Sequence, residues 1–409
     1  MDNAQESAGA AGQGGSVKRG GKQVRIWLGV AAGVILLVLA VVGLWPRRAD
    51  WGLPARGAYE PAPVAFEGDS QVLERTVIVP TLDTEAVGDK DVVWCGSFQL
   101  AWNRLKDDVV KEPVLLEGAQ AVADRLNAGA VTEADVPAGC CYAAAGLMQD
   151  GIVERIKREM AGQFPEAPEP NLVVTSLTMA VAYAYLEAAA AFATPYFERE
   201  LEFTGADGKA VRVSGFGVSQ GNNPAVAERL AKQLEILYAD YEVDEDGYET
   251  GGVLECVLDL DRTSEAVQVI VALVDWQGTL AKTVAYLEEK MAVWSTEEGL
   301  RRMGSNDYLA VPNVHFNVEH RFAKLEGQDL VNPGCEVTWI EAALQRIEFR
   351  LDRSGAFVRS GAQVVVKASR PCEFVFDRPF LILLRQRSGG RPFFAMWVAD
   401  GELLCKVGR

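Results

Sequence analysis

The residues best suited to chemistry are one cysteine and two histidines. Cys95 lies in the stretch Trp94–Phe98 (WCGSF), and the chain's two histidines are His315 and His320. A cysteine nucleophile needs a base, usually a histidine, within hydrogen-bond reach. No feature of the sequence connects either histidine with Cys95, so we interpret Cys95 as a buried structural residue. The sequence therefore predicts that the protein is not an enzyme.

These residue types do not form a metal-binding pattern either. His315 and His320 are five residues apart on an expected strand, which places them on opposite faces. The seven cysteines show no C-x-x-C spacing, and the adjacent Cys140 and Cys141 are badly placed to bond each other. An odd number of cysteines leaves at least one thiol free in a monomer. We therefore predict no metal and no cofactor.

Two further motifs and the charge balance exclude several kinds of binding site and partner. The acidic run Asp240–Glu249 lacks the full spacing of a calcium loop, so we interpret it as a solvated loop. Residues 215–217 (GFG) are not followed by the Lys-Ser/Thr pair of a phosphate-binding loop. A formal net charge of −17 argues against nucleic acid and an anionic membrane surface as partners. A basic partner is left open.

The N-terminal part predicts a membrane anchor. Residues 1–25 are expected to be a disordered cytoplasmic tail. Ile26–Trp45 contains no charged residue, and at about 1.5 Å per residue it would span the roughly 30 Å hydrocarbon core. A cleavable signal peptide is the alternative, but residues 46–48 (PRR) follow instead of a small-residue cleavage site. A slight excess of basic residues before the span predicts a single-pass cell-membrane protein with its large domain extracytoplasmic.

The remainder is predicted to be a Pro-rich linker, residues 46–75, and one folded domain, residues 76–409. Leu172–Ala193 is almost wholly apolar, but Glu187 and several hydroxyls favour a central strand buried on both faces over a second membrane span. The other expected elements are a strand at Thr76–Pro80, a strand end or turn running into a helix at Asp91–Leu105, helices at Ala119–Asn127 and Gly151–Phe164, a hairpin at Leu201–Val218, strands at Val253–Asp259 and Ala266–Val274, a helix at Gly278–Val293 and a strand at Tyr308–Phe322.

The most regular alternation lies near the C-terminus. Apolar and polar residues alternate in Arg346–Leu351, which is typical of a half-buried strand. Asp352–Gly355 has the Asp and Gly of a type I turn, and Ala356–Val366 alternates again. If Leu351 pairs with Ala356, the inward residues of both stretches share one face. Two interpretations stay open: a permanently paired hairpin, which the residues alone favour, and a loop patterned to become a strand.

The segment that follows resembles the C-terminal hairpin of serpins. Phe376–Arg385 (FDRPFLILLR), a turn at residues 388–390 and Phe393–Val398 (FFAMWV) are similar to the serpin pattern F-x-x-x-R-P-F-x-F-x-I-R, turn, F-M-G-x-V. Residues 271–291 and Tyr308–Phe322 also resemble serpin segments in the same order. The chain is thus similar to a divergent, bacterial-type serpin with an N-terminal membrane anchor. The resemblance implies an α+β, serpin-like fold with antiparallel β-sheets and packed helices, in which Tyr196 and Phe197 replace the usual aromatic anchor.

The resemblance also implies a reactive-centre loop. The candidate reactive-loop residues are Gly355, Lys367, Ala368, Ser369 and Arg370. Phe357–Arg359 interrupts the small residues that follow the hinge glycine in inhibitory serpins, so a non-inhibitory binding or structural module is slightly favoured. The alternative is a serine or cysteine protease inhibitor that is cut near Lys367–Arg370. The expected partners are the membrane, through Ile26–Trp45, and a protease or another extracytoplasmic protein.

Overall fold

The computed structural model describes residues 62–407, except 171, 173–175, 177–178, 189, 220–222, 295–301, 305, 336–337 and 355–371. The chain divides into two units, residues 1–50 and 51–409, and all described residues belong to the second. The predicted tail, the predicted membrane span Ile26–Trp45 and the predicted loop strand Ala356–Val366 lie outside the described residues. No helix in the described part is long and apolar enough to cross a membrane.

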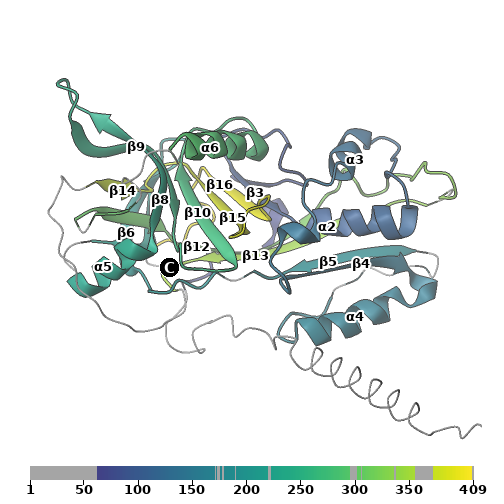
Figure 1. Ribbon diagram of the computed structural model, residues 1–409. Coiled ribbons are helices and arrows are strands. Elements are labelled where there is room, and N and C mark those ends of the chain that lie inside the picture. Colours follow the sequence, from purple (N-terminus) through teal and green to yellow (C-terminus); the bar gives the residue numbers. More distant parts are fainter. Residues whose placement is uncertain are drawn as a thin grey trace, which may run out of the picture. The chain divides into compact units, whose positions relative to one another are not determined.

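Strands and helices follow one another in a mixed order (Figure 1). The strands are β1 (Phe66–Asp69), β2 (Thr76–Ile78), β3 (Asp91–Cys95), β4 (Cys141–Leu147), β5 (Ala180–Leu186), β6 (Phe197–Thr204), β7 (Ala210–Val218), β8 (Glu235–Val243), β9 (Glu249–Asp259), β10 (Val267–Leu273), β11 (Tyr308–Pro312), β12 (Val314–Arg321), β13 (Leu344–Leu351), β14 (Glu373–Val375), β15 (Phe380–Gln386) and β16 (Phe394–Val398). The helices are α2 (Ser97–Arg104), the π-helix η2 (Leu105–Val110), α3 (Gln120–Asn127), α4 (Ile152–Gln163), α5 (Pro224–Gln233) and α6 (Leu280–Trp294). Short 3-10 turns lie at Ser70–Val72, Glu133–Asp135 and Met148–Asp150.

Eleven strands form one large sheet. Its order is β2-β3-β16-β15-β10-β9-β14-β11-β7-β6, with β8 paired to β9. β10 is antiparallel to both β9 and β15, and all seven of its residues are buried. Six of them are apolar, and the one polar side chain, Gln268, donates to the Asp259 carboxylate at 2.9 Å. α6 packs against β8 and β16 through Leu280, Val284 and Leu287, and the Lys282 N–H donates to the Thr279 hydroxyl at its start. The predicted combination of helices and sheets is confirmed, but the expected antiparallel sheets are in fact mixed, because β2–β3, β11–β14 and β14–β9 pair in parallel.

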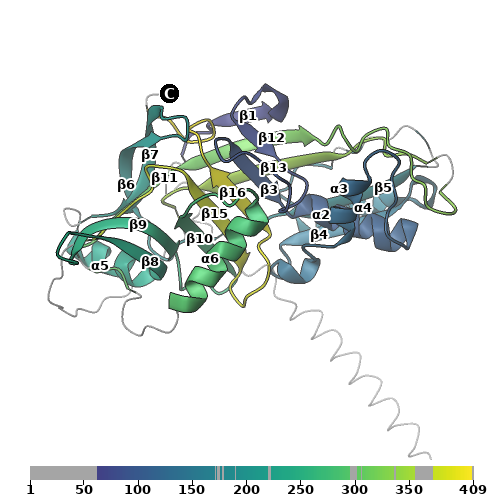
Figure 2. The ribbon, with the colours of Figure 1, turned by 90° about the horizontal axis from the view of Figure 1, so that it is seen from above.

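Two smaller sheets accompany the large one. β1, β12 and β13 form a three-stranded sheet, and β4 and β5 form a two-stranded one. β4 and β5 share a separate apolar core with α4, built around Tyr142, Ile156 and Met160. α2 packs against β4, β5 and β13, so it touches both small sheets (Figure 2).

The structure corrects several expectations. Ordered structure begins inside the predicted linker 46–75, because β1 pairs in parallel with β12. The strand expected in Leu172–Ala193 is β5, which is half-buried instead of buried on both faces and which, within the described residues, pairs with β4 alone. The acidic run Asp240–Glu249 belongs to the β8–β9 hairpin, so only its turn is a loop.

The single strand expected at Tyr308–Phe322 is in fact two strands in two sheets. β11 belongs to the large sheet and β12 to the three-stranded sheet. The change comes at Asn313, whose N–H donates to the Ser214 carbonyl and whose own carbonyl accepts from Cys405. Pro312 precedes it and has no N–H for a ladder, which is where a strand is expected to break.

Candidate functional site

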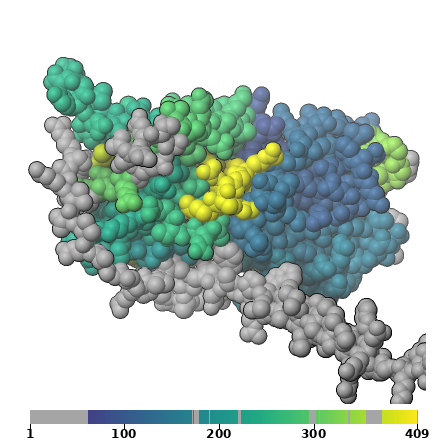
Figure 3. Space-filling view, in the orientation of Figure 1, coloured from purple at the N-terminus to yellow at the C-terminus, as the bar shows by residue number. Residues whose placement is uncertain are grey.

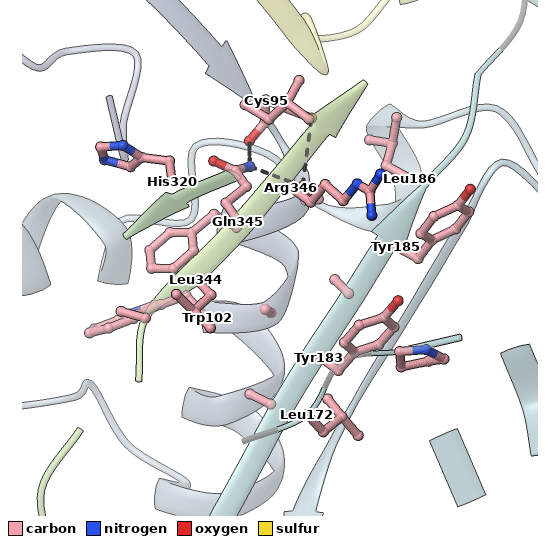
Figure 4. A pocket seen from close by; sticks show the side chains of 18 of the residues that line it. Cys95, Trp102, Leu172, Tyr183, Tyr185, Leu186, His320, Leu344, Gln345 and Arg346 are labelled. Atoms are coloured by element: carbon pink, nitrogen blue, oxygen red, sulfur yellow. Dashed lines mark hydrogen bonds between the residues drawn. The ribbon is translucent and has the colours of Figure 1, made fainter. Parts of the chain in front are cut away.

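The candidate site is a groove between two strands that each have a free edge. In the described part of the chain β13 pairs with β12 alone, and β5 pairs with β4 alone. Both line one cavity of about 1640 Å³. Figure 4 shows β13, with Leu344 and Arg346, and β5, with Tyr183 and Leu186, running in the same direction along this groove. Among the described residues, one edge of each of these two strands therefore has no strand partner, and both strands line a common space.

The groove is lined mostly by apolar and aromatic side chains. α2 contributes Trp102 and β5 contributes Tyr183 and Tyr185 (Figure 4). Trp102 donates its indole N–H to the Asn127 side chain at 3.0 Å, which fixes the ring. Burial raises the pKa of Tyr183 to about 12, so this phenol stays neutral. An apolar lining with free backbone edges suits an extended peptide strand better than a charged small molecule.

Gln345 ties β13 to the start of α2. Its amide nitrogen donates to the Cys95 carbonyl and to the Ser97 hydroxyl, each at 2.9 Å. Gln345 is 6% exposed, and it alternates in phase with the buried residues Ile347, Phe349 and Leu351. The sequence analysis missed this residue. Its signal was a polar side chain at an inward position of the alternating pattern, which in a folded protein needs a hydrogen-bond partner.

The inward face of β13 rests on the large sheet. The ring of Phe349 stacks on that of Phe394 of β16 at 4.2 Å between centroids and lies 5.9 Å from that of Phe316 of β12. The half-buried strand predicted at Arg346–Leu351 is therefore confirmed, with alternating burial along all eight residues of β13. This packing holds β13 in place, and within the described part of the chain its edge toward β5 pairs with no strand.

The chain leaves β13 through an anchored turn. The Ser354 N–H donates to the Asp352 carboxylate at 2.8 Å; the predicted type I turn ends at Gly355, which lies outside the described residues. The Arg353 carbonyl accepts from the Tyr196 N–H at 3.1 Å, and the Arg353 side chain donates to the Tyr196 carbonyl and to Glu198, both at 2.9 Å. Tyr196 is fully buried. Arg353, two residues before segment 355–371, is thus attached to Tyr196, the residue that precedes β6.

The other end of segment 355–371 is attached to the same sheet. The Cys372 N–H donates to the Asp307 carboxylate at 2.8 Å, and β14 follows at once, parallel to β11. β14 and β6 are separated by β11 and β7, so the two attachments lie about three strand spacings, or about 14 Å, apart. Seventeen residues, 355–371, can span about 56–61 Å. The segment therefore contains much more chain than its end points require.

The structure separates the residues first considered for chemistry. Burial raises the pKa of the Cys95 thiol, which lies 3.6 Å from the Ser97 hydroxyl. The ring Nδ1 of His315 bonds to the Ala62 carbonyl at 2.6 Å, and that of His320 to the Ser70 hydroxyl at 2.7 Å. Within the described residues Cys95 and the histidines therefore form no nucleophile–base pair. Burial lowers the pKa of His320, which keeps its ring neutral.

The candidate reactive-loop residues Gly355, Lys367, Ala368, Ser369 and Arg370 lie outside the described residues. Their nearest described neighbours are Ser354 and Cys372, whose positions are given above. Within residues 62–407 and their gaps, no group of three or more His, Cys, Asp or Glu side chains is placed to hold a metal ion.

The fold is similar to those of solved serpin structures. One is native protease nexin-1, crystallised with heparin: it is 11% identical, with a TM-score of 0.44, over 75% of this chain and 97% of that chain. Another is Serpin48, a highly specific serpin in the insect Tenebrio molitor: it is 14% identical, with a TM-score of 0.35, over 62% of this chain and 65% of that chain. No family model and no curated protein matches the sequence.

Proposed function

We propose that the folded part of this chain accepts its own segment 355–371 as a strand and acts as a serpin-like protease inhibitor. The observation that carries the proposal is that β13 and β5 line one cavity and that each has an edge without a strand partner among the described residues. A protease would cut near Lys367–Arg370, and the freed strand would enter the groove. The inserted strand would then form backbone hydrogen bonds with the edge N–H and C=O groups of both β5 and β13.

The direction of the strands supports this proposal. β5 and β13 run the same way along the groove (Figure 4). A chain that turns at Asp352–Gly355 would run back antiparallel to both neighbours. Antiparallel pairing needs only a tight turn, whereas parallel pairing would need a long crossover.

The expected register also accommodates the bulky residues after the hinge. With Leu351 opposite Ala356, Val358 faces Phe349 on the buried side. Phe357 and Arg359 then fall on the other face, opposite Arg350 and Glu348, both of which are exposed. Large side chains at these two positions therefore cost little in packing, and the Glu348–Arg359 pair is favourable across neighbouring strands.

A second candidate is a non-inhibitory binding or structural module. The observation that favours it is the sequence Phe357–Arg359, where inhibitory serpins carry small residues. In such a module segment 356–366 would stay permanently paired, and cutting it would release nothing. Neither candidate gives a catalytic role to Cys95, His315 or His320.

We also propose that the domain is held at the cell membrane, outside the cytoplasm, by the charge-free segment Ile26–Trp45. Protease added to intact cells or spheroplasts should then digest residues beyond 50 and spare the N-terminal tail. Full protection of the large domain would reverse this orientation. The bacterial type remains an inference from the sequence resemblance.

Trypsin tests the inhibitor proposal, because its primary pocket takes Lys and Arg. Trypsin incubated with an excess of the domain should lose activity toward a small substrate, and Lys367→Ala with Arg370→Ala should remove the effect. If the segment is cut while trypsin keeps its full activity, the inhibitor proposal fails and the non-inhibitory module stands.

A further inference from the structure

Three backbone stretches outside the named strands form a small patch of sheet. The Glu117 N–H donates to the Asp329 carbonyl at 2.9 Å, and the Val331 N–H donates to the Leu115 carbonyl at 3.0 Å. On the other side, the Leu330 N–H donates to the Thr338 carbonyl at 2.8 Å, and Asp329 bridges Trp339. Residues 115–117, 329–331 and 338–340 thus lie side by side, and we call their solvent side the outer face.

The two faces of this patch differ sharply in burial. Val114, Leu116 and Leu330 point inward and are buried. On the outer face, Leu115 is 38%, Val331 54% and Trp339 50% exposed. Leu115 and Val331 are neighbours across a hydrogen bond, and Trp339 is opposite Asp329, two residues from Val331. Contiguous exposed apolar side chains of this kind mark interaction sites, whereas single ones do not.

The rim of the outer face is acidic. Glu117 and Asp329 belong to the same strands, and Glu341 accepts the Trp339 indole N–H at 2.7 Å. The Asn332 side-chain amide donates to the Glu112 carboxylate and accepts the Leu115 N–H. The Glu112 carboxylate therefore also belongs to the rim. Figure 3 shows light-green atoms, which belong to the chain between β12 and β13, at the surface beside blue atoms of the residues that follow α2.

We propose that the outer face docks a polypeptide that carries alternating basic and apolar side chains. Its apolar side chains would cover Leu115, Val331 and Trp339, and its basic ones would meet the carboxylates of the rim. A second copy of this chain is a poor occupant, because both rims would be acidic and the net charge is −17. The acidic rim likewise disfavours an anionic lipid surface. Trp339 and Glu341 also line the cavity between β13 and β5, so the outer face adjoins the groove proposed for strand insertion, but docking on it needs no cut in segment 355–371.

The test uses the folded domain and a synthetic peptide of about eight residues that alternates Lys and Leu, matched in length to a strand. Fluorescence titration should show binding that Val331→Asp and Leu115→Asp each weaken by about tenfold or more. Val243→Asp is the control, because Val243 is 58% exposed and lies between Glu242 and Asp244 on the β8–β9 hairpin. It should leave the binding unchanged. Thermal unfolding of each variant checks that the fold is kept.

A second peptide that alternates Lys and Gly separates apolar docking from simple charge attraction, and it should bind much more weakly than the Lys–Leu peptide. Equal binding of the two peptides, or unchanged binding to Val331→Asp, overturns the proposal. The proposal is also overturned if sedimentation shows that the domain self-associates and Val331→Asp abolishes this, since the occupant is then a second copy of the chain. Binding to phosphatidylcholine vesicles that Val331→Asp abolishes would assign the face to a membrane instead.

Discussion

Arg353 and Tyr196 are joined through both polar groups of the Tyr196 backbone. The Tyr196 N–H donates to the Arg353 carbonyl, and the Tyr196 carbonyl accepts from the Arg353 side chain. Tyr196 packs at 5.3 Å from the ring of Phe216 and donates its hydroxyl to the Leu260 carbonyl. The anchor of the loop's first end is therefore part of the core of the large sheet, whereas the groove it would enter belongs to the smaller sheets.

Arg353→Ala tests this anchor. The change removes one hydrogen bond and a largely exposed ion pair to Glu198, so we expect a loss of about 1 kcal/mol in unfolding free energy. Proteolysis within residues 355–371 should become faster, because one end of the segment is released. Arg346→Ala is the matched control, since it also removes one hydrogen bond, to Asn317 at 3.0 Å, and an exposed ion pair, to Glu319 at 3.9 Å, without touching Tyr196. Equal proteolysis rates in the two variants would contradict the anchor.

Gln345→Ala should destabilise the intact domain. The variant leaves the Cys95 carbonyl and the Ser97 hydroxyl without their donor in a buried place, at a cost of about 1–3 kcal/mol. Leu344→Ala next to it should cost less, because Leu344 is 43% exposed. Chemical denaturation measures both, and a Gln345 variant as stable as the Leu344 variant would show that the contact contributes nothing.

Asp91 gives a pH dependence of known sign. It is fully buried, and its carboxylate accepts the N–H groups of Ala399 and Asp400 at 2.7 and 2.8 Å. Burial, reinforced by the nearby carboxylates Asp400 and Glu402, raises the pKa of Asp91 well above its ordinary value. The folded state therefore keeps its proton to a higher pH than the unfolded state does. Stability linked to this group is present at low pH and is lost as the pH rises from about 4 through the folded-state pKa.

Asp91→Asn removes that titration. We expect the variant to be more stable than the parent at pH 7 and the difference to shrink toward pH 4, as measured by urea unfolding across this range. Asp89→Asn, at a carboxylate that is 53% exposed, should show no such trend. If the stability of the unchanged protein instead rises from pH 4 to 7 relative to Asp91→Asn, the pH dependence has the opposite sign. That result would refute a raised pKa for Asp91.

Glu348 and Arg359 report on the register of the inserted strand. In the cut protein they are expected to face each other, so Glu348→Arg alone should destabilise it by about 0.2–1 kcal/mol. Combining it with Arg359→Glu should restore the loss. In the uncut protein Glu348 faces Asn317 of β12, and the two changes should act independently. A double-mutant cycle without coupling in the cut form would reject this register.

Much of the fold was predictable because local patterns coincide with local structure. The alternation in β13, the Asp-Gly turn between β6 and β7 and the apolar β15–β16 hairpin each carry their own signal. β1 was missed because four residues have too little pattern, and they are held by parallel pairing to β12, which is nearly 250 residues away.

The groove itself could not be predicted from local patterns. Whether β5 and β13 pair with each other is decided by how two small sheets pack on α2, which is a property of the whole fold. The anchor at Arg353 has the same origin, because Tyr196 and Glu198 meet it from a distant part of the chain. Of these features, only Gln345 could have been found from the sequence, as a polar residue at an inward position of an alternating strand.

Thermal unfolding of the isolated domain before and after a single cut between Lys367 and Arg370 tests the central claim most directly. An inserted strand buries Val358, Val364 and Val366, each of which contributes roughly 1.5–3 kcal/mol when fully buried. Against a typical total of about 5–15 kcal/mol, the midpoint should rise by more than about 5 °C. Val358→Asp should abolish this rise and leave the uncut protein unchanged. An unchanged or lowered midpoint after the cut would contradict strand insertion and leave the permanently paired module.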